Sequence, residues 1–183
     1  FFYSNVFSEE SKLPKLDNPM SVEYLKKNLR KSQPRLVFNS SIERNLRKKF
    51  ETDPMLQNIY QSIKYNAGMV LEKDLITVKI PDNPRSQRNQ LGISRDFLWR
   101  INMLATVYRM EKDPEILKRI NDEVVAACNF PTWYPKHFVD VGEMSLAIAL
   151  AIDWTAGDLP ESTVKLAWKA VSEAGSVAGG PGS

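Results

Sequence analysis

Apolar residues recur along most of the chain at three- and four-residue intervals, which is the spacing of amphipathic helices. Stretches rich in proline, glycine or polar residues interrupt the pattern and mark the turns between helices. The pattern predicts an all-α protein whose helices follow one another as hairpins. The predicted helices span approximately 22–31, 40–50, 54–71, 95–110, 114–128, 139–154 and 160–174.

Several of these helix starts carry local signals. Asp-Pro at 53–54 and again at 113–114 places a capping carboxylate before a proline in the first helical turn. Ser40 with Glu43 has the pattern of a capping box, in which each side chain binds the other residue's backbone N–H group. Ser94 is the predicted cap of the helix at 95–110.

Two of the predicted helices, 95–110 and 139–154, are apolar on nearly every face, most clearly over Met144–Ile152. A helix of this kind must be covered on all sides, whereas the other helices have charged outer faces and need cover on one side only. Alternation of the two types suits an incomplete (α/α) toroid, with an inner and an outer ring of helices. It suits an irregular helical bundle equally well.

Three stretches lie outside the helical pattern. Residues 1–20 are predicted to be irregular. Residues 72–92 form a long connection, in which Leu75–Ile80 alternates like a strand. The tail 175–183 (GSVAGGPGS) has the composition of a flexible linker. The predicted organisation is therefore an irregular N-terminal segment, a helical domain over 21–174, and a linker-like tail.

Composition is ordinary for a globular protein, since 43% of the 183 residues are hydrophobic and 26% are charged. The net charge of +3 is too small to indicate nucleic-acid binding. Cys128 is the only cysteine and His137 the only histidine, which excludes a His/Cys metal site. No apolar run is long enough to span a membrane, and Phe1–Phe7 is not an intact signal peptide. We expect no metal, cofactor, nucleic acid or membrane partner.

The segment Trp133–His137 (WYPKH) is the first candidate for a binding site. Trp133 and Tyr134 offer aromatic faces, which stack on the C–H surfaces of sugars. Lys136 and His137 are suited to hydroxyls and carboxylates, and the helix start that follows favours anions. Alternatively, Phe130, Trp133 and Phe138 form a hydrophobic plug, and His137 is a capping or core histidine.

Arg95 is the second candidate, because it lies in the first turn of a helix that should be mostly covered. A charged group in such a place needs a partner or a wet cavity. It shares a polar stripe with Asn102, Thr106 and Arg109. Either Arg95 binds a ligand or it forms a structural salt bridge with Asp96, Asp140 or Glu143.

Asp140 and Glu143 lie one turn apart on the helix after the WYPKH loop. Paired carboxylates serve as acid and base in glycoside hydrolysis. Two carboxylates on one helix face cannot flank a scissile bond from both sides, so a structural role is favoured. A serine–histidine–aspartate triad would require His137 and a serine that no spacing identifies. Glycine-rich phosphate loops and nucleophile elbows are absent from the sequence.

Five segments of the chain, in the same order and with the same spacing, resemble the N-terminal part of heparinase II/III-like polysaccharide lyases and alginate lyases. The longest is NFPTWYPKHFVD followed by Gly142-Glu143-Met144, which is similar to the family's F-P-x-W-x-P-x-H-F-x-D-x-x-E-M run. The other matching pieces are Gln33–Phe38 (QPRLVF), the helix with Arg44 and Leu46 before the Asp-Pro at 53, Ser94-Arg95-Asp96 with Arg100-Ile101, and Ala151–Trp154 (AIDW) with Leu159-Pro160.

The resemblance implies an incomplete (α/α) toroid, truncated here before its catalytic core, in a periplasmic or secreted enzyme. Such enzymes cleave uronic-acid polysaccharides, of the alginate or heparan sulfate type, by β-elimination. Their catalytic Asn-His pair and Tyr lie beyond the matching segment, with the rest of the toroid and the β-sandwich domains, so we expect no catalytic residue in this chain. What carries over is the wall of the substrate groove. Its implied members are Arg95, Trp133, Tyr134, Lys136 and His137, with Asp140 and Glu143 in support.

Three other interpretations stay open on the sequence. The domain could bind carbohydrate without any chemistry in its parent protein. It could be a structural or interaction domain, with the WYPKH loop as a plug. Non-specific nucleic-acid binding by the basic N-terminal helices is disfavoured by the mild net charge.

Overall fold

The computed structural model describes residues 21–78 and 90–178 of the chain. These residues form helices and no strand, which confirms the all-α fold class. The chain divides into two compact units, Phe1–Lys31 and Ser32–Ser183. The first unit contains α1 (Val22–Asn28), whose start is capped by the hydroxyl of Ser21.

The second unit contains a helix at each position where the sequence predicts one. The Asp-Pro signals are confirmed, since the carboxylates of Asp53 and Asp113 accept backbone N–H groups in the first turns of the helices that follow them. The helices are α2 (Ser40–Phe50), α3 (Pro54–Glu72), α4 (Gln90–Glu111), α5 (Pro114–Cys128), α6 (Phe138–Thr155) and α7 (Glu161–Ala178).

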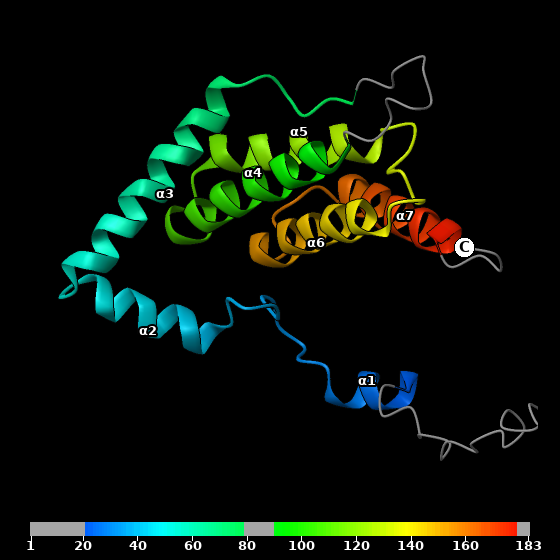
Figure 1. Ribbon diagram of the computed structural model, residues 1–183. Helices are drawn as coiled ribbons and strands as arrows, with labels where there is room; N and C mark the ends of the chain where they lie inside the picture. Colours follow the sequence, from blue (N-terminus) through cyan, green and yellow to red (C-terminus); the bar gives the residue numbers. More distant parts are fainter. Residues whose placement is uncertain (1–20, 79–89, 179–183) are drawn as a thin grey trace, which may run out of the picture. The chain divides into compact units, whose positions relative to one another are not determined.

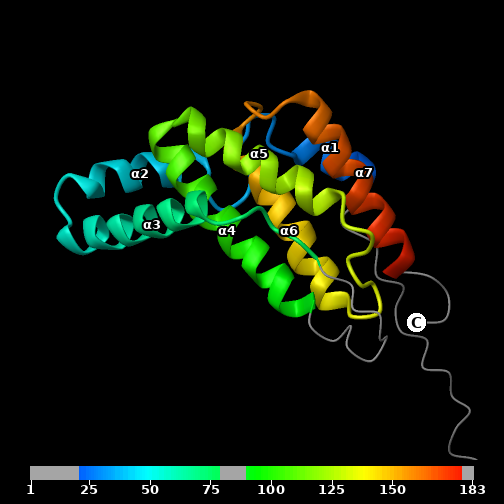
Figure 2. The same ribbon diagram turned by 90° about the horizontal axis from the view of Figure 1, so that it is seen from above.

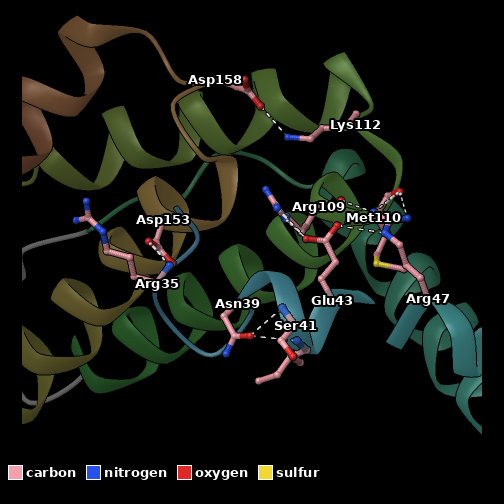
Figure 3. Close-up of polar contacts among 11 residues, drawn as sticks. Arg35, Asn39, Ser41, Glu43, Arg47, Arg109, Met110, Lys112, Asp153 and Asp158 are labelled. Atoms are coloured by element: carbon pink, nitrogen blue, oxygen red, sulfur yellow. Dashed lines mark hydrogen bonds and ion pairs between the residues drawn. The ribbon is translucent and has the colours of Figure 1, made fainter. Parts of the chain in front are cut away.

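Two predicted helix caps are wrong. Asn39, not Ser40, caps α2, because its side-chain oxygen accepts the backbone N–H groups at the start of that helix (Figure 3). Glu43 binds arginines instead of closing a capping box. Helix α4 begins at Gln90, so Ser94 lies inside it rather than at its cap.

The connecting segments also differ from expectation. Residues 75–78 are not a strand, and residues 79–80 of the predicted strand lie outside the described part of the chain. Helix α7 continues to Ala178, past the predicted end at 174. The predicted irregular segment at 1–20 and the end of the tail at 179–183 also lie outside the described residues.

Helix α4 packs most extensively against α6, and it also contacts α3 and α5 (Figures 1 and 2). Because α4 to α7 are joined in succession by turns, alternate helices run in the same direction. Ser94 near the start of α4 contacts Glu143 near the start of α6, and Tyr108 near the end of α4 contacts Asp158 just after α6. The result is a parallel inner pair, α4 and α6, backed by α5 and α7, which contact each other.

The hydrophobic core lies between these two pairs. Most of the fully buried side chains come from α4, α5 and α6, and each valine, leucine, isoleucine or phenylalanine among them contributes about 1.5–3 kcal/mol of transfer free energy. Helix α6 is not covered on all sides as predicted, since Leu146 is 48% exposed. The main core residues are Phe97, Ile101, Leu104, Ile120, Val124, Ala147, Ile148 and Ala151.

Helix α2 is fixed to the end of α4 by charged groups. The carboxylate of Glu43 accepts hydrogen bonds of 2.7 and 2.9 Å from Arg109, and Arg47 donates to Glu43 and to the carbonyl oxygens of Arg109 and Met110 (Figure 3). Burial acts to raise the pKa of Glu43, but the hydrogen bonds from Arg109 and Arg47 outweigh it and lower the pKa.

A second charged group holds the chain that leaves α3. Glu123 is fully buried, and its carboxylate contacts Arg100 and Arg119 at 2.8 Å and accepts the backbone N–H of Ile76 at 3.0 Å. Arg119 also donates to the carbonyl oxygen of Lys73. A buried carboxylate is tolerated only with such partners, so Glu123 fixes the start of the connection between α3 and α4.

Candidate functional site

Five residues from two distant parts of the chain form a polar cluster at the N-terminal ends of α4 and α6. Ser94 and Arg95 lie near the start of α4, His137 is the N-cap of α6, and Asp140 and Glu143 follow in its first turns. The parallel packing of the two helices brings these segments together. We call these residues Ser94, Arg95, His137, Asp140 and Glu143 the polar cluster.

Ser94 is the centre of the polar cluster. Its Oγ lies 2.6 Å from Glu143 Oε2, 3.4 Å from Asp140 Oδ1 and 3.1 Å from the carbonyl oxygen of Leu91. A hydroxyl has one hydrogen to donate, and the shortest distance indicates that Glu143 receives it. Ser94 is 2% exposed, so this hydrogen bond is shielded from water.

Arg95 lies at one end of the polar cluster. Its Nε is 3.3 Å from Glu143 Oε1, and its side chain is 64% exposed. Of the partners that the sequence suggested for Arg95, the structure selects Glu143. An ion pair this exposed contributes at most about 1 kcal/mol to stability, so it does not explain by itself why an arginine stands here.

His137 lies at the other end. Its Nδ1 is 3.2 Å from Asp140 Oδ2, and the imidazole is 48% exposed whereas the carboxylate is 4% exposed. Nδ1 therefore lies close enough to the Asp140 carboxylate to form an ion pair when the imidazole is protonated. His137 gives no side-chain cap to α6, so the predicted capping role is not what its ring performs.

The order of the groups excludes a nucleophilic triad. Asp140 lies between Ser94 and His137, and within the described residues no hydrogen bond joins the serine to the histidine. A serine nucleophile requires its base next to its Oγ, with the carboxylate behind that base. The polar cluster is therefore an arrangement for holding side chains in place and not one for acyl transfer.

The WYPKH loop has a buried half and an exposed half. Trp133 is 6% exposed and its indole N–H donates to the carbonyl oxygen of Ala127 at 3.0 Å, so its ring is covered and cannot stack on a sugar as expected. Lys136 is exposed, and Tyr134 is half-buried. Of the three residues of the predicted plug, Trp133 is buried and Phe130 is half-buried, but Phe138 is 69% exposed, so the plug prediction is wrong for Phe138.

Tyr134 occupies a strained backbone position. Its φ of 54° lies in the left-handed region, which non-glycine residues rarely adopt. The N–H of Tyr134 donates to Thr132 Oγ1 at 3.0 Å, and its carbonyl oxygen accepts from the N–H of His137 at 2.9 Å. A strained conformation of this kind costs about 1–3 kcal/mol and persists only where the surroundings hold it. Here these two hydrogen bonds hold the backbone that leads into His137.

A cavity of about 220 Å³ lies on the other side of Trp133, between the loop and α7. Its lining includes Phe130, Cys128 and Glu173. Burial raises the pKa of the Cys128 thiol to about 11, so at neutral pH the sulfur is protonated and is a poor nucleophile. The cavity therefore offers shape and an apolar wall but no reactive group.

Within residues 21–78 and 90–178, the acidic, histidine and cysteine side chains make no group suited to a metal ion. No helix in the same ranges is long and apolar enough to cross a membrane. Neither a protein-family model nor a curated protein matches the sequence. The site must accordingly be judged on its residues and geometry.

Among the predicted site residues, the structure brings together Arg95, His137, Asp140 and Glu143. Lys136, which precedes His137 in the sequence, is exposed. Ser94 was missed as a site residue because it was taken for a helix cap. The signal that could have found it is the apolar periodicity, which starts before Ser94 at Leu91 and Ile93.

Proposed function

We propose that this chain forms part of the substrate-groove wall of a polysaccharide lyase of the heparinase II/III-like and alginate lyase type, acting on uronic-acid polysaccharides by β-elimination in the periplasm or outside the cell. The observation that carries the proposal is the convergence of two resembling segments, 94–101 and 129–144, in the polar cluster. Those segments are separate in sequence, and their motif residues are the ones that meet.

Helix packing gives further support. In an (α/α) toroid the repeating unit is a helical hairpin, and successive inner helices run parallel with outer helices behind them running in the opposite direction, as α4 to α7 do. The resembling segments 33–38 and 151–154 also meet, because Asp153 binds the backbone of Arg35 and Leu36, and Phe38 packs on Trp154 with ring centroids 5.3 Å apart.

The proposed role is binding rather than catalysis by this chain alone. β-Elimination needs a group that neutralises the uronate carboxylate, a base for the C5 proton and an acid for the leaving oxygen. The resemblance places those groups beyond the matching segment. Arg95, Lys136 and His137 instead supply exposed donors for an anionic sugar chain, with Asp140 and Glu143 behind them.

A non-catalytic structural domain is the second candidate, and one observation favours it. Trp133, the strongest sugar-stacking candidate, is buried and hydrogen-bonded within the chain. This candidate predicts no binding of polyuronates at physiological salt.

Calorimetric titration of the purified chain with alginate, heparan sulfate and hyaluronan, with neutral dextran as the control, tests the proposal. We expect binding to at least one uronate polymer, no binding to dextran, and no rise in the ultraviolet absorbance of unsaturated uronate. Absence of binding to every uronate polymer would overturn the proposed function. A clear rise in absorbance would show that the chain itself carries catalytic groups.

A further inference from the structure

The arginines of α4 differ in exposure and in how many of their guanidinium nitrogens form hydrogen bonds within the protein. Arg100 is 9% exposed and is bound to Glu123, and Arg109 is 14% exposed and is bound twice to Glu43. Both are committed to holding the fold. Arg95 is 64% exposed and uses only its Nε, so its Nη1 and Nη2 make no hydrogen bond or ion pair with the described residues.

Glu143 gives Arg95 a defined orientation. The carboxylate of Glu143 is 20% exposed, and its two oxygens are engaged separately, Oε2 by Ser94 and Oε1 by Arg95. Because the buried Ser94 hydroxyl fixes one oxygen at 2.6 Å, the other faces Arg95 from a fixed position. The guanidinium is thus held through its Nε, and its two Nη atoms make no hydrogen bond with Glu143.

We propose that this relay, Ser94 to Glu143 to Arg95, presents the Nη edge of Arg95 to bind the carboxylate of a uronate residue with two parallel hydrogen bonds. A guanidinium matches the two oxygens of a carboxylate in a planar fork, which a lysine ammonium cannot do. Arg95 is then the residue that selects a carboxylated sugar, and Ser94 and Glu143 are positioning residues. The inference rests on the proposed function and names the ligand group of its site.

Charge within the polar cluster is consistent with selection rather than general attraction. The two carboxylates of Asp140 and Glu143 offset the charge of Arg95, so the polar cluster does not attract polyanions through a large positive field. A ligand therefore gains affinity by forming two hydrogen bonds with the guanidinium of Arg95, and not merely by carrying negative charge near it. Arg95 to lysine is therefore the informative change, since it keeps the charge and removes the fork.

The test is calorimetric titration of the whole chain with a defined oligouronate and with the same oligosaccharide after its carboxyl groups have been reduced to alcohols. We expect Arg95→Lys to weaken oligouronate binding by about tenfold and to leave binding of the reduced sugar unchanged. Arg44→Lys, at an exposed arginine of α2, is the matched control and should leave both affinities unchanged.

Ser94→Ala tests the relay. We expect it to weaken oligouronate binding by about three- to tenfold, again without effect on the reduced sugar, because Arg95 keeps its charge but loses its fixed partner. A variant that merely loosens the fold would lower both affinities together, and Arg95→Lys tests the proposal even if Ser94→Ala unfolds. If the wild-type chain binds oligouronate and Arg95→Lys binds it equally well, this inference is wrong and the proposed function stands. If the wild type binds no oligouronate, the proposed function itself is overturned.

Discussion

The carboxylate of Asp153 accepts the backbone N–H of Arg35, with its oxygens 2.9 and 2.7 Å from that nitrogen (Figure 3). The two residues are 118 positions apart, and the same carboxylate also accepts the N–H of Leu36 at 2.8 Å. Asp153 is 6% exposed near the end of α6. One buried acidic side chain therefore anchors the segment before α2 to the inner helix pair.

Replacing Asp153 with alanine should destabilise the protein by about 2–4 kcal/mol, because two backbone N–H groups lose a charged acceptor. Urea unfolding followed by tryptophan fluorescence measures the change, and Trp154 beside Phe38 reports on this region. The matched control is Asp122→Ala, whose partner Lys118 is 76% exposed, and it should change stability by about 0.5 kcal/mol or less. Equal effects of the two substitutions would show that Asp153 does not anchor the segment.

Docking of α2 should depend on pH through Glu43. Its pKa is lowered from 4.5 in the folded protein, so its stabilising contribution is complete above about pH 4.5 and is lost as pH falls through the lower folded-state value. Wild type should therefore exceed Glu43→Gln in stability by about 1–3 kcal/mol at pH 7, and the gap should shrink below pH 4.5.

Chemical denaturation at pH 7, 5 and 3 measures this gap for Glu43. Glu51→Gln, an exposed carboxylate at the end of the same helix, is the control and should differ little from wild type at any pH. A Glu43→Gln gap that stays constant from pH 7 to pH 3 would contradict the ion pair with Arg109 as its source.

Cys128 should react slowly while the protein is folded. With a pKa of about 11 against the usual 9.0, its thiolate fraction at pH 8 falls by about 100-fold, and alkylation by iodoacetamide should slow accordingly. Mass spectrometry of the single labelled site gives the rate in buffer and in urea. Raising the pH to 10 should accelerate the folded-state reaction. Equal rates in buffer and urea would indicate an exposed, unperturbed thiol.

Much of the fold could be predicted because its signals are local. Asp53 and Asp113 cap their helices as expected, since an aspartate before a proline satisfies the first-turn N–H groups whatever the rest of the chain does. The cap of α2 could not be predicted so securely, because Asn39 and Ser40 are both good cap residues. Ser40 was chosen because Glu43 could complete a capping box with it. In the structure Glu43 binds Arg109 instead, and Asn39 is the cap.

The candidate site was predictable as a set of segments but not as a set of contacts. Arg95 and Glu143 were both singled out, yet only the packing of α4 against α6 shows that they pair. Trp133 illustrates the converse, because an aromatic residue in a loop gives no sequence signal of whether its ring is covered. Ser94 gained its role from the parallel alignment of two helices, and that alignment is a tertiary property.

The most direct test of the polyuronate site uses the fact that His137 is the only histidine of the chain. Its imidazole signals in a nuclear magnetic resonance spectrum are therefore unique reporters of the polar cluster. Titration with an oligouronate should shift these signals progressively to saturation, and the carboxyl-reduced oligosaccharide should leave them in place. Binding of the oligouronate without any change in the His137 signals would contradict the placement of the site at the N-terminal ends of α4 and α6.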